Sequence, residues 1–546
     1  MKKHFGILFM ALLLMAALGA CAGGTGESSE DKSSASAVPG TESRDASAEP
    51  TEEENVQENP SRELTDSTGP VYGGSVVVGV QQDIDSLDPH KATAAGTKEI
   101  LFNIFEGLVK SDENGNLMNA VASDYSISDD GLVYTFTLRE NVKFHNGNVV
   151  TAEDVKYSLE RASGLLDGTA LISSLKPLKS VEILDEHTVQ VTVDSANTEL
   201  VYSFTTAIIP AGSGEDASGT PIGTGPFSFV SYKPQEGIVL KKNGEYWQQG
   251  LPYLEEVTFQ IVNSPDTALL NLKGGSIDIY PYLTDSQANE LRSDYQILAA
   301  PSNVVQALFL NNGDSTLSDV RVRQAICYAM DKDMANEFVT GGNSMLVGSA
   351  MLPAMKDYYK ELNDVYGTSA NIEKAKELLR EAGYPEGVEL EITVPSNYEV
   401  HMQTAEVIAE QLKEAGIHAE ILPVEWNTWL EEVYNGRNYQ STICGITCDM
   451  TPGYLLNRFQ TESSKNFINF ASAEYDEVYL KAAASLDLAQ KGEYYKQLQQ
   501  ILTDEAGTAF IQVPPITIAM SPKLAGYKFY PIYVQDMSTV YWTEAK

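Results

Sequence analysis

A chain of 546 residues is too long for a single hydrophobic core, so at least two folding units are expected. Its hydrophobic fraction of 43% is that of a globular protein. The formal net charge of −39 argues against nucleic acid as a partner, because such partners need a basic face, and it disfavours adsorption to anionic lipid.

The N-terminus has the features of an export signal. Lys2 and Lys3 precede an apolar run, Phe5–Leu18, that is too short to span a bilayer as a mature helix. The following Leu18–Cys21 (LGAC) resembles the lipobox of bacterial lipoproteins. This resemblance implies a signal peptide over residues 1–20, lipidation of Cys21 and anchoring to the outer face of the bacterial cell membrane. We expect the lipid to be the protein's only membrane attachment.

Residues 21–70 are predicted to be the lipidated cysteine followed by a disordered acidic linker. The segment is rich in Ser, Thr, Gly and Glu and has few large apolar residues, so it cannot bury enough surface to order itself. We expect it to separate the folded part from the membrane.

Apolar spacing predicts the first elements of the globular part in chain order. Alternation predicts strands, and apolar residues three and four apart predict helices. The expected strands are 75–80, 133–138, 181–184, 188–193 and 237–241; the expected helices are 98–109 and 152–161.

The segment from Ser369 to Val424 predicts a βαβ unit. A helix starts at the N-cap Asn371 and ends at Gly383. The strand Leu390–Val394, a helix over 403–415 and the strand 419–424 follow. This order indicates an α/β fold with a parallel sheet covered by helices.

The stretch Ser441–Pro452 (STICGITCDMTP) predicts a buried strand that ends at Asp449. A lone buried carboxylate is costly, so Asp449 needs a cation, and the nearest basic residues in sequence are Arg437 and Arg458. We interpret the missing cation as part of a ligand. The alternative is a carboxylate that caps a turn or pairs with a distant arginine.

Three further cysteines, at 327, 444 and 448, are interpreted as buried small hydrophobic side chains. Cys444 and Cys448 lack the second ligand pair that zinc requires, and no histidines are paired at metal-ligand spacing. The sequence therefore implies neither a metal nor a cofactor.

Many short stretches together resemble the solute-binding proteins of peptide and nickel ABC importers, the family of dipeptide and oligopeptide receptors (family 5). They occur in family order from about residue 75 to the C-terminus. The stretches are 86–91 (SLDPHK), 105–108 (FEGL), 138–144 (LRENVKF), 146–147 (NG), 151–155 (TAEDV), 223–227 (GTGPF), 240–243 (LKKN), 246–247 (YW), 319–326 (DVRVRQAI) and 475–476 (YD).

This resemblance implies a two-lobed, periplasmic-binding-protein-like α/β clamshell of the large class II type, in which the chain crosses between lobes twice. The implied first lobe is 71–303 with 515–546, including an extra subdomain near 93–220. The implied second lobe is 304–514. The crossings are expected near 303–310 and 514–519, and ligands would lie between the lobes.

The resemblance also implies the site. Asp449 would bind the α-ammonium of a peptide, and Gly445, Ile446 and Cys448 would contact its backbone. Thr93, Ala94 and Ala95 match the first-lobe segment that faces the ligand. Trp426 matches a pocket-wall tryptophan, with a core aromatic as its alternative, and His401 lies near a histidine that serves longer peptides, with an exposed histidine at a helix start as its alternative.

Two departures from the family pattern bear on the identity of the ligand. Family members usually carry Trp where Ile446 stands, and no Arg or Lys occupies 438–447, where some receptors bind the ligand carboxylate. The expected function is thus a monomeric receptor that delivers short peptides to an ABC permease and its ATPase subunits. Open alternatives are a nickel chelate, an oligosaccharide or another small polar solute as cargo. An exported hydrolase is disfavoured by the lack of catalytic motifs.

Overall fold

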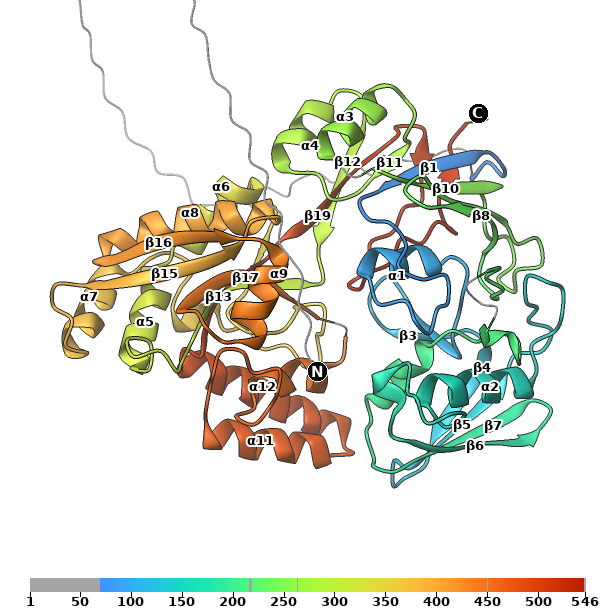
Figure 1. The fold of residues 1–546 in the computed structure, drawn as a ribbon, viewed down its shortest axis with the longest axis horizontal. Helices are drawn as coiled ribbons and strands as arrows, with labels where there is room; N and C mark the ends of the chain where they lie inside the picture. The colour runs from blue at the N-terminus through green and yellow to red at the C-terminus, as the bar shows by residue number, and fades with distance from the viewer. Residues whose placement is uncertain (1–68, 216–218, 263, 449, 545–546) are drawn as a thin grey trace, which may run out of the picture. The chain divides into compact units, whose positions relative to one another are not determined.

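The computed structural model describes residues 69–215, 219–262, 264–448 and 450–544. The predicted signal peptide, Cys21, residues 21–68 of the linker, and Asp449 lie outside the described residues. Two large β-sheets and one smaller sheet, each covered by helices, organise the described chain (Figure 1). Among the described residues, no helix combines the length and apolar character needed to cross a membrane.

The first lobe is built on a seven-stranded mixed sheet. β1 pairs in parallel with β10 and β11, and the other neighbours are antiparallel. In spatial order the strands are β12 (Gln296–Pro301), β19 (Pro515–Met520), β11 (Ile279–Tyr280), β1 (Ser75–Val80), β10 (Glu256–Ile261), β9 (Gly237–Lys242) and β8 (Phe227–Lys233). Its helices are α1 (Ala95–Leu101), α3 (Pro265–Lys273) and α4 (Asp285–Leu291).

A four-stranded antiparallel sheet is inserted between β1 and β8 in the chain. Its order is β4 (Ala122–Ile127), β5 (Val133–Leu138), β7 (Thr188–Val193) and β6 (Leu178–Asp185). Helix α2 (Ala152–Ser163) buries Val155 and Leu159 against it. A capping box between Thr151 and Asp154 starts this helix, and Gly164, in the left-handed conformation, ends it. Two small antiparallel strand pairs complete the first lobe: β2 (Val109–Ser111) with β3 (Leu117–Asn119), and, near the C-terminal end, β20 (Leu524–Ala525) with β21 (Tyr541–Trp542).

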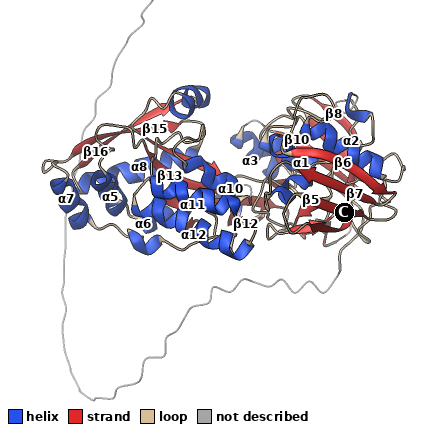
Figure 2. Cartoon of the chain, turned by 90° about the horizontal axis from the view of Figure 1, so that it is seen from below, coloured by secondary structure: helices blue, strands red, loops and turns tan. Residues whose placement is uncertain are grey.

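The second lobe is built on a six-stranded mixed sheet. Its order is β14 (Met345–Leu346), β18 (Thr508–Val513), β13 (Val304–Leu310), β17 (Ser441–Thr447), β15 (Val388–Pro395) and β16 (Ile417–Val424). One core cluster joins it to α5 (Val320–Ala329), α6 (Lys332–Thr340), α7 (Ile372–Glu381) and α8 (Glu399–Glu414). Another joins it to α10 (Pro452–Leu456), α11 (Ala473–Ala484) and α12 (Leu488–Asp504). Figure 2 shows α5, α7 and α8 beside β15 and β16.

The chain passes between the two large sheets twice. It leaves β12 at Pro301 and enters β13 at Val304, and it returns from β18 at Val513 to β19 at Pro515. β12 pairs with β19 in one sheet and β13 with β18 in the other, so the two passages lie side by side. The expected α/β fold with two crossings is confirmed.

Two predictions about local structure need correction. The βαβ unit is present as β15–α8–β16 with parallel strands, but the sheet is mixed rather than parallel because β13 and β18 pair antiparallel within it. The helix expected over 98–109 ends at Leu101. A Cβ on Gly107 would lie 2.4 Å from the carbonyl oxygen of Phe204, and this close approach belongs to an extended connection that leads into β2.

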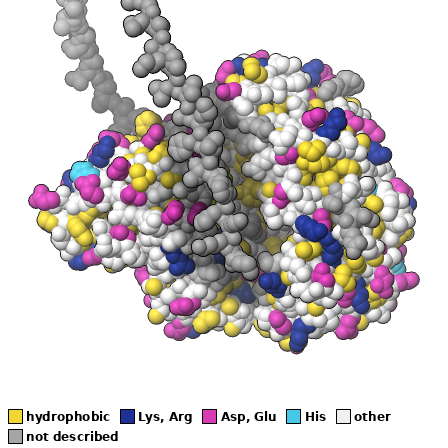
Figure 3. Space-filling model, viewed as in Figure 1, with side chains coloured by type: hydrophobic (Ala, Val, Ile, Leu, Met, Phe, Trp, Pro, Cys, Tyr) yellow, Lys and Arg dark blue, Asp and Glu magenta, His cyan; other side chains and the backbone are white. Residues whose placement is uncertain are grey.

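Acidic side chains are distributed over the molecular face shown in Figure 3, together with fewer basic ones, as the net charge of −39 requires. Self-repulsion of this kind favours solubility.

Candidate functional site

Strand β17 has one edge that is only partly paired. It pairs with β13 over its whole length, from Ser441 opposite Leu310 to Thr447 opposite Val304. On its other side β15 pairs only with Ser441 and Thr442. Among the described residues, no strand continues this ladder beyond Thr442, so the edge from residue 443 to residue 447 is open to a further strand.

The hydrogen bonds at the two ends of the β13–β17 ladder show which groups face this open edge. Asn311 donates its N–H to the carbonyl of Gln440 at 3.0 Å, and Cys448 donates to the carbonyl of Asn303 at 2.8 Å. Antiparallel bonding alternates along a strand, so the even-numbered residues between them also bond to β13. The N–H and C=O groups of Gly445 and Thr447 therefore point to the open edge.

This register separates the three expected backbone contacts. Gly445 presents its backbone to the open edge, whereas Ile446 presents its backbone to β13. The N–H of Cys448 is already bonded to Asn303, and its buried side chain lies within the core. Thr447 is a residue that the sequence interpretation missed, because the alternation becomes visible only once the pairing with β13 is known.

His401 lies beside Gly445 and is buried, with 7% of its surface exposed. Its ring atoms Cε1 and Nε2 lie 3.5 and 3.6 Å from the position that a Cβ on Gly445 would take. Gln306 donates its side-chain amide to Nδ1 at 2.8 Å, which assigns the ring hydrogen to Nε2. The alternative reading of His401 as an exposed histidine at a helix start is wrong.

A chain of buried polar groups holds His401 in place. The side-chain oxygen of Gln306 accepts hydrogen bonds from Gln512 at 2.7 Å and from Thr404 at 3.2 Å. Burial lowers the pKa of His401 to about 4, so the ring is neutral near neutral pH. The arrangement provides a neutral, oriented N–H donor next to the strand.

Trp426 belongs to an aromatic group beside β17. It is half-buried and stacks on Trp429, with ring centroids 5.1 Å apart and an interplanar angle of 6°. Trp429 is buried and donates its indole N–H to the hydroxyl of Thr442 at 2.9 Å, so it is a core residue. Tyr398, which is 40% exposed, packs edge-on against Trp426 and extends the aromatic wall.

Residues Thr93, Ala94 and Ala95 form the turn that starts α1. The carboxylate of Asp85 accepts the N–H and hydroxyl of Thr93 and the N–H of Ala94, at 2.7–2.9 Å. Burial raises the pKa of Asp85, but hydrogen bonds from Thr93, Thr97 and Ala94 outweigh it and hold this pKa below its usual range. These hydrogen bonds fix the turn to Asp85, so the donors of Thr93 and Ala94 are occupied within the chain.

A tyrosine from the C-terminal segment also reaches the strand. The hydroxyl of Tyr533 lies 3.4 Å from the hydroxyl of Thr447. Tyr533 follows β19 in the chain, so a residue on the first-lobe side of the second crossing contacts the end of β17. The sequence interpretation did not identify Tyr533.

The stretch 86–91 has a structural role. Asp88 is buried and accepts two hydrogen bonds from the guanidinium of Arg161, at 2.6 and 3.2 Å. His90 is bonded to the same guanidinium and to the carbonyl of Ala207. These residues hold α2 to the connection that precedes α1, and they do not line the edge of β17.

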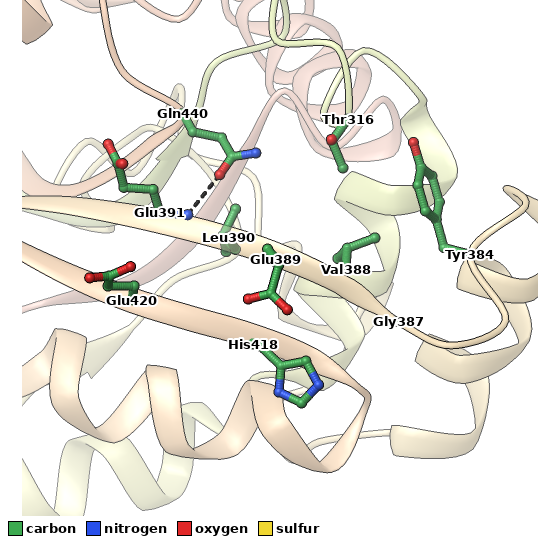
Figure 4. Close-up of a pocket in the computed structure, with 10 residues that line it drawn as sticks. All are labelled: Thr316, Tyr384, Gly387, Val388, Glu389, Leu390, Glu391, His418, Glu420 and Gln440. Atoms are coloured by element: carbon green, nitrogen blue, oxygen red, sulfur yellow. Dashed lines mark hydrogen bonds between the residues drawn. The ribbon is translucent and has the colours of Figure 1, made fainter.

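A surface pocket of about 530 Å³ lies on the second lobe at the start of β15 and β16 (Figure 4). Glu389, Glu391, His418 and Glu420 lie on the exposed face of these strands, and Gln440 bonds to the N–H of Glu391. In the described part of the chain, no group of three or more His, Cys, Asp or Glu side chains could hold a metal ion.

Comparison with known proteins places the chain among binding proteins. Residues 116–467 match the family described as "Bacterial extracellular solute-binding proteins, family 5 Middle". The glutathione-binding protein GsiB of Pectobacterium atrosepticum is 27% identical over 486 residues, which cover 85% of this chain and 93% of that protein.

Solved structures show the same fold. The substrate-binding protein CtaP of Listeria monocytogenes is 24% identical with a TM-score of 0.78, covering 87% of this chain and 100% of that chain. The oligopeptide-binding protein AppA of Bacillus subtilis, solved with a nonapeptide, is 24% identical with a TM-score of 0.69, covering 88% and 100%.

The fold and the family match together define a two-lobed, extracytoplasmic solute-binding protein of the kind that serves ABC importers. The chain belongs to family 5 of the bacterial extracellular solute-binding proteins, because that match covers more than half of it.

Proposed function

We propose that this protein captures short peptides at the open edge of β17 and delivers them to an ABC permease driven by its ATPase subunits. The observation that carries the proposal is the edge itself. An extended peptide can pair with the backbone groups of Gly445 and Thr447 as an added strand. Such pairing is common to all peptides and therefore gives affinity without a fixed sequence.

The amino end of the peptide is assigned to Asp449, which directly follows this edge in the chain. A carboxylate paired with an ammonium makes a strong, charge-assisted hydrogen bond. We assign the neutral N–H of His401 to an oxygen acceptor of the ligand and Trp426 to the wall of a side-chain pocket. Ile446 and Cys448 support the strand from its paired side, and Thr93, Ala94 and Ala95 belong to the facing turn.

The relatives support a peptide-like cargo. Glutathione, named for one relative, is a peptide-like compound, and a nonapeptide was bound by one structural neighbour. We also propose that residues 71–303 with 515–546 and residues 304–514 move as two lobes of a monomer. In this proposal the signal peptide is removed and Cys21 carries the membrane anchor.

Calorimetry of the full chain in mild detergent tests the proposal with two probes, a pool of di- to pentapeptides and reduced glutathione. We expect binding to at least one probe, and the Asp449→Asn variant should weaken it by about 10- to 100-fold, because a hydrogen bond to a charged group is removed. Glu474→Gln, which changes an exposed carboxylate on α11, is the matched control. Binding of neither probe, or equal binding by Asp449→Asn, would falsify the peptide assignment.

A further inference from the structure

A half-buried carboxylate of the first lobe lies against the second lobe. Glu199 follows β7 in the chain, and its two carboxylate oxygens each lie 3.0 Å from the backbone N–H of Gly453, at the start of α10. The hydroxyl of Tyr495, on α12, donates to the same carboxylate at 2.5 Å. One side chain thus accepts hydrogen bonds from two helices of the other lobe.

The groups around this contact fit one another closely. Lys491 of α12 is 2% exposed and donates its ammonium to the hydroxyl of Thr198, the neighbour of Glu199, at 2.8 Å. A Cβ on Gly453 would lie 2.7 Å from the Tyr495 hydroxyl oxygen and 3.0 Å from Glu199, so a larger residue does not fit there. A positive and a negative side chain therefore enter the junction from opposite lobes.

The surroundings of the contact shift the pKa values of both charged side chains, Glu199 and Lys491. Burial raises the pKa of Glu199, whereas the hydrogen bonds from Tyr495 and Gly453 and the charge of Lys491 lower it. The burial effect is the larger one. Burial likewise lowers the pKa of Lys491, and Glu199 opposes this shift. Contact between the lobes removes water from the Glu199 carboxylate, and the donors of the second lobe replace that water only while the two lobes are in contact.

The junction lies directly beyond the candidate site in the chain. Gly453 follows Thr447, the last residue of β17, by six positions. Between them, the buried Met450 packs against Gly115 of the first lobe: a Cβ on Gly115 would lie 2.6 Å from the Met450 methyl carbon. The segment after the open edge is therefore held by the first lobe at both Met450 and Gly453.

We propose that Glu199 is a positioning residue: its contacts with Gly453 and Tyr495 hold the two lobes together next to the site, and it does not touch the ligand. This inference rests on the proposed binding function and adds to it a group that slows release. A contact made only in the closed arrangement stabilises that arrangement and lengthens the time a ligand stays bound.

Hydrogen exchange and stopped-flow kinetics on the full chain in mild detergent test the inference. Exchange at the amides of residues 453–456 is measured without ligand and with the peptide pool, in the wild type, Glu199→Gln and Tyr495→Phe. Glu186→Gln, an exposed carboxylate on the same small sheet's hairpin, is the control. We expect about tenfold faster exchange in both junction variants, unchanged exchange in β13 and β17, and about tenfold faster peptide release with an unchanged association rate.

The outcomes separate this inference from the binding function. Protection of residues 453–456 that depends on Glu199 in either state supports the junction even if no peptide in the pool binds. Protection that depends on Glu199 in neither state overturns the inference. A release rate equal to that of the wild type in both junction variants that still bind peptide overturns it as well, and the binding function then stands alone.

Discussion

His401 packs against Gly445 at van der Waals distance, and Val304 leaves no room for a side chain at Gly445. The Nε2 atom of His401 is 3.6 Å from the position of a Cβ on Gly445, and Cγ1 of Val304 is only 2.2 Å from that position. The face of β17 at residue 445 is therefore flat, and two elements, α8 and β13, set how close a neighbour can come.

We expect Gly445→Ala to lower the free energy of unfolding by about 1–3 kcal/mol, because the new methyl group overlaps Val304. The double variant with Val304→Ala should recover most of this loss. Urea unfolding of the two single variants and the double variant measures the coupling. An equal cost of Gly445→Ala in both backgrounds would contradict the overlap.

The buried His401 predicts a specific pH dependence of stability. Its pKa is about 4 in the folded chain, against an ordinary value of 6.5, so below pH 6.5 the unfolded chain takes up a proton that the folded chain does not. Stability is complete above pH 6.5 and falls as the pH drops towards 4. Between pH 7 and pH 5 the wild type should lose about 2 kcal/mol more than His401→Gln. Identical losses in urea unfolding would show that the ring is not buried.

Trp426 and Trp429 stack on each other, but we expect Trp429 to determine stability and Trp426 to determine which peptides bind. Trp429→Ala should cost about 3–5 kcal/mol of stability, since its ring is buried and bonded to Thr442. Trp426→Ala should leave thermal unfolding nearly unchanged and alter which peptides of a pool bind. The idea of a pocket wall fails if mass spectrometry finds the same peptides retained by the wild type and by Trp426→Ala.

The stretch 86–91 should matter for stability rather than for ligand. Arg161→Met removes the buried cation of Asp88 and leaves only the exposed Lys91, 3.5 Å away, at a cost of about 3–5 kcal/mol at neutral pH. The difference in the free energy of unfolding between the wild type and the variant should become smaller towards pH 4, because Asp88 in the variant becomes protonated there and needs no cation. Urea unfolding at both pH values measures this change, and a deficit independent of pH would argue against the ion pair.

The buried thiols should be inert in the native protein. Burial raises the pKa of Cys327 to about 12, and it raises the pKa of Cys444 further above the ordinary value. Because the thiolate is the reactive form, a thiol reagent should modify Cys327, Cys444 and Cys448 only after unfolding. Mass spectrometry after native and denaturing labelling checks this, and native modification of Cys327 or Cys444 would contradict their burial.

Local patterns in the sequence predicted the regular elements well. The strands over 75–80, 133–138 and 188–193 have the expected bounds, because alternation is a property of a few neighbouring residues. The helix over 98–109 failed where the close approach of Gly107 to Phe204, a residue 97 positions away, decides the backbone.

The burial of His401 could have been predicted from the sequence. It lies four positions before Ala405, on the same inner stripe of α8 as Ile408 and Leu412. The backbone direction of Gly445 and Thr447 could not, because it depends on which residues of β13 stand opposite, and that register joins segments more than 100 positions apart. The same holds for the Glu199–Gly453 contact.

The placement of β18 and β19 has a consequence for how the chain can fold. β18 lies between β14 and β13, and β19 lies between β12 and β11, so each large sheet is incomplete until residues 508–520 have joined it. Pairings over such long separations form slowly. The two large sheets of a nascent chain therefore stay incomplete until residues 508–520 are made, whereas the four-stranded sheet, built from residues 122–193, can be completed much earlier.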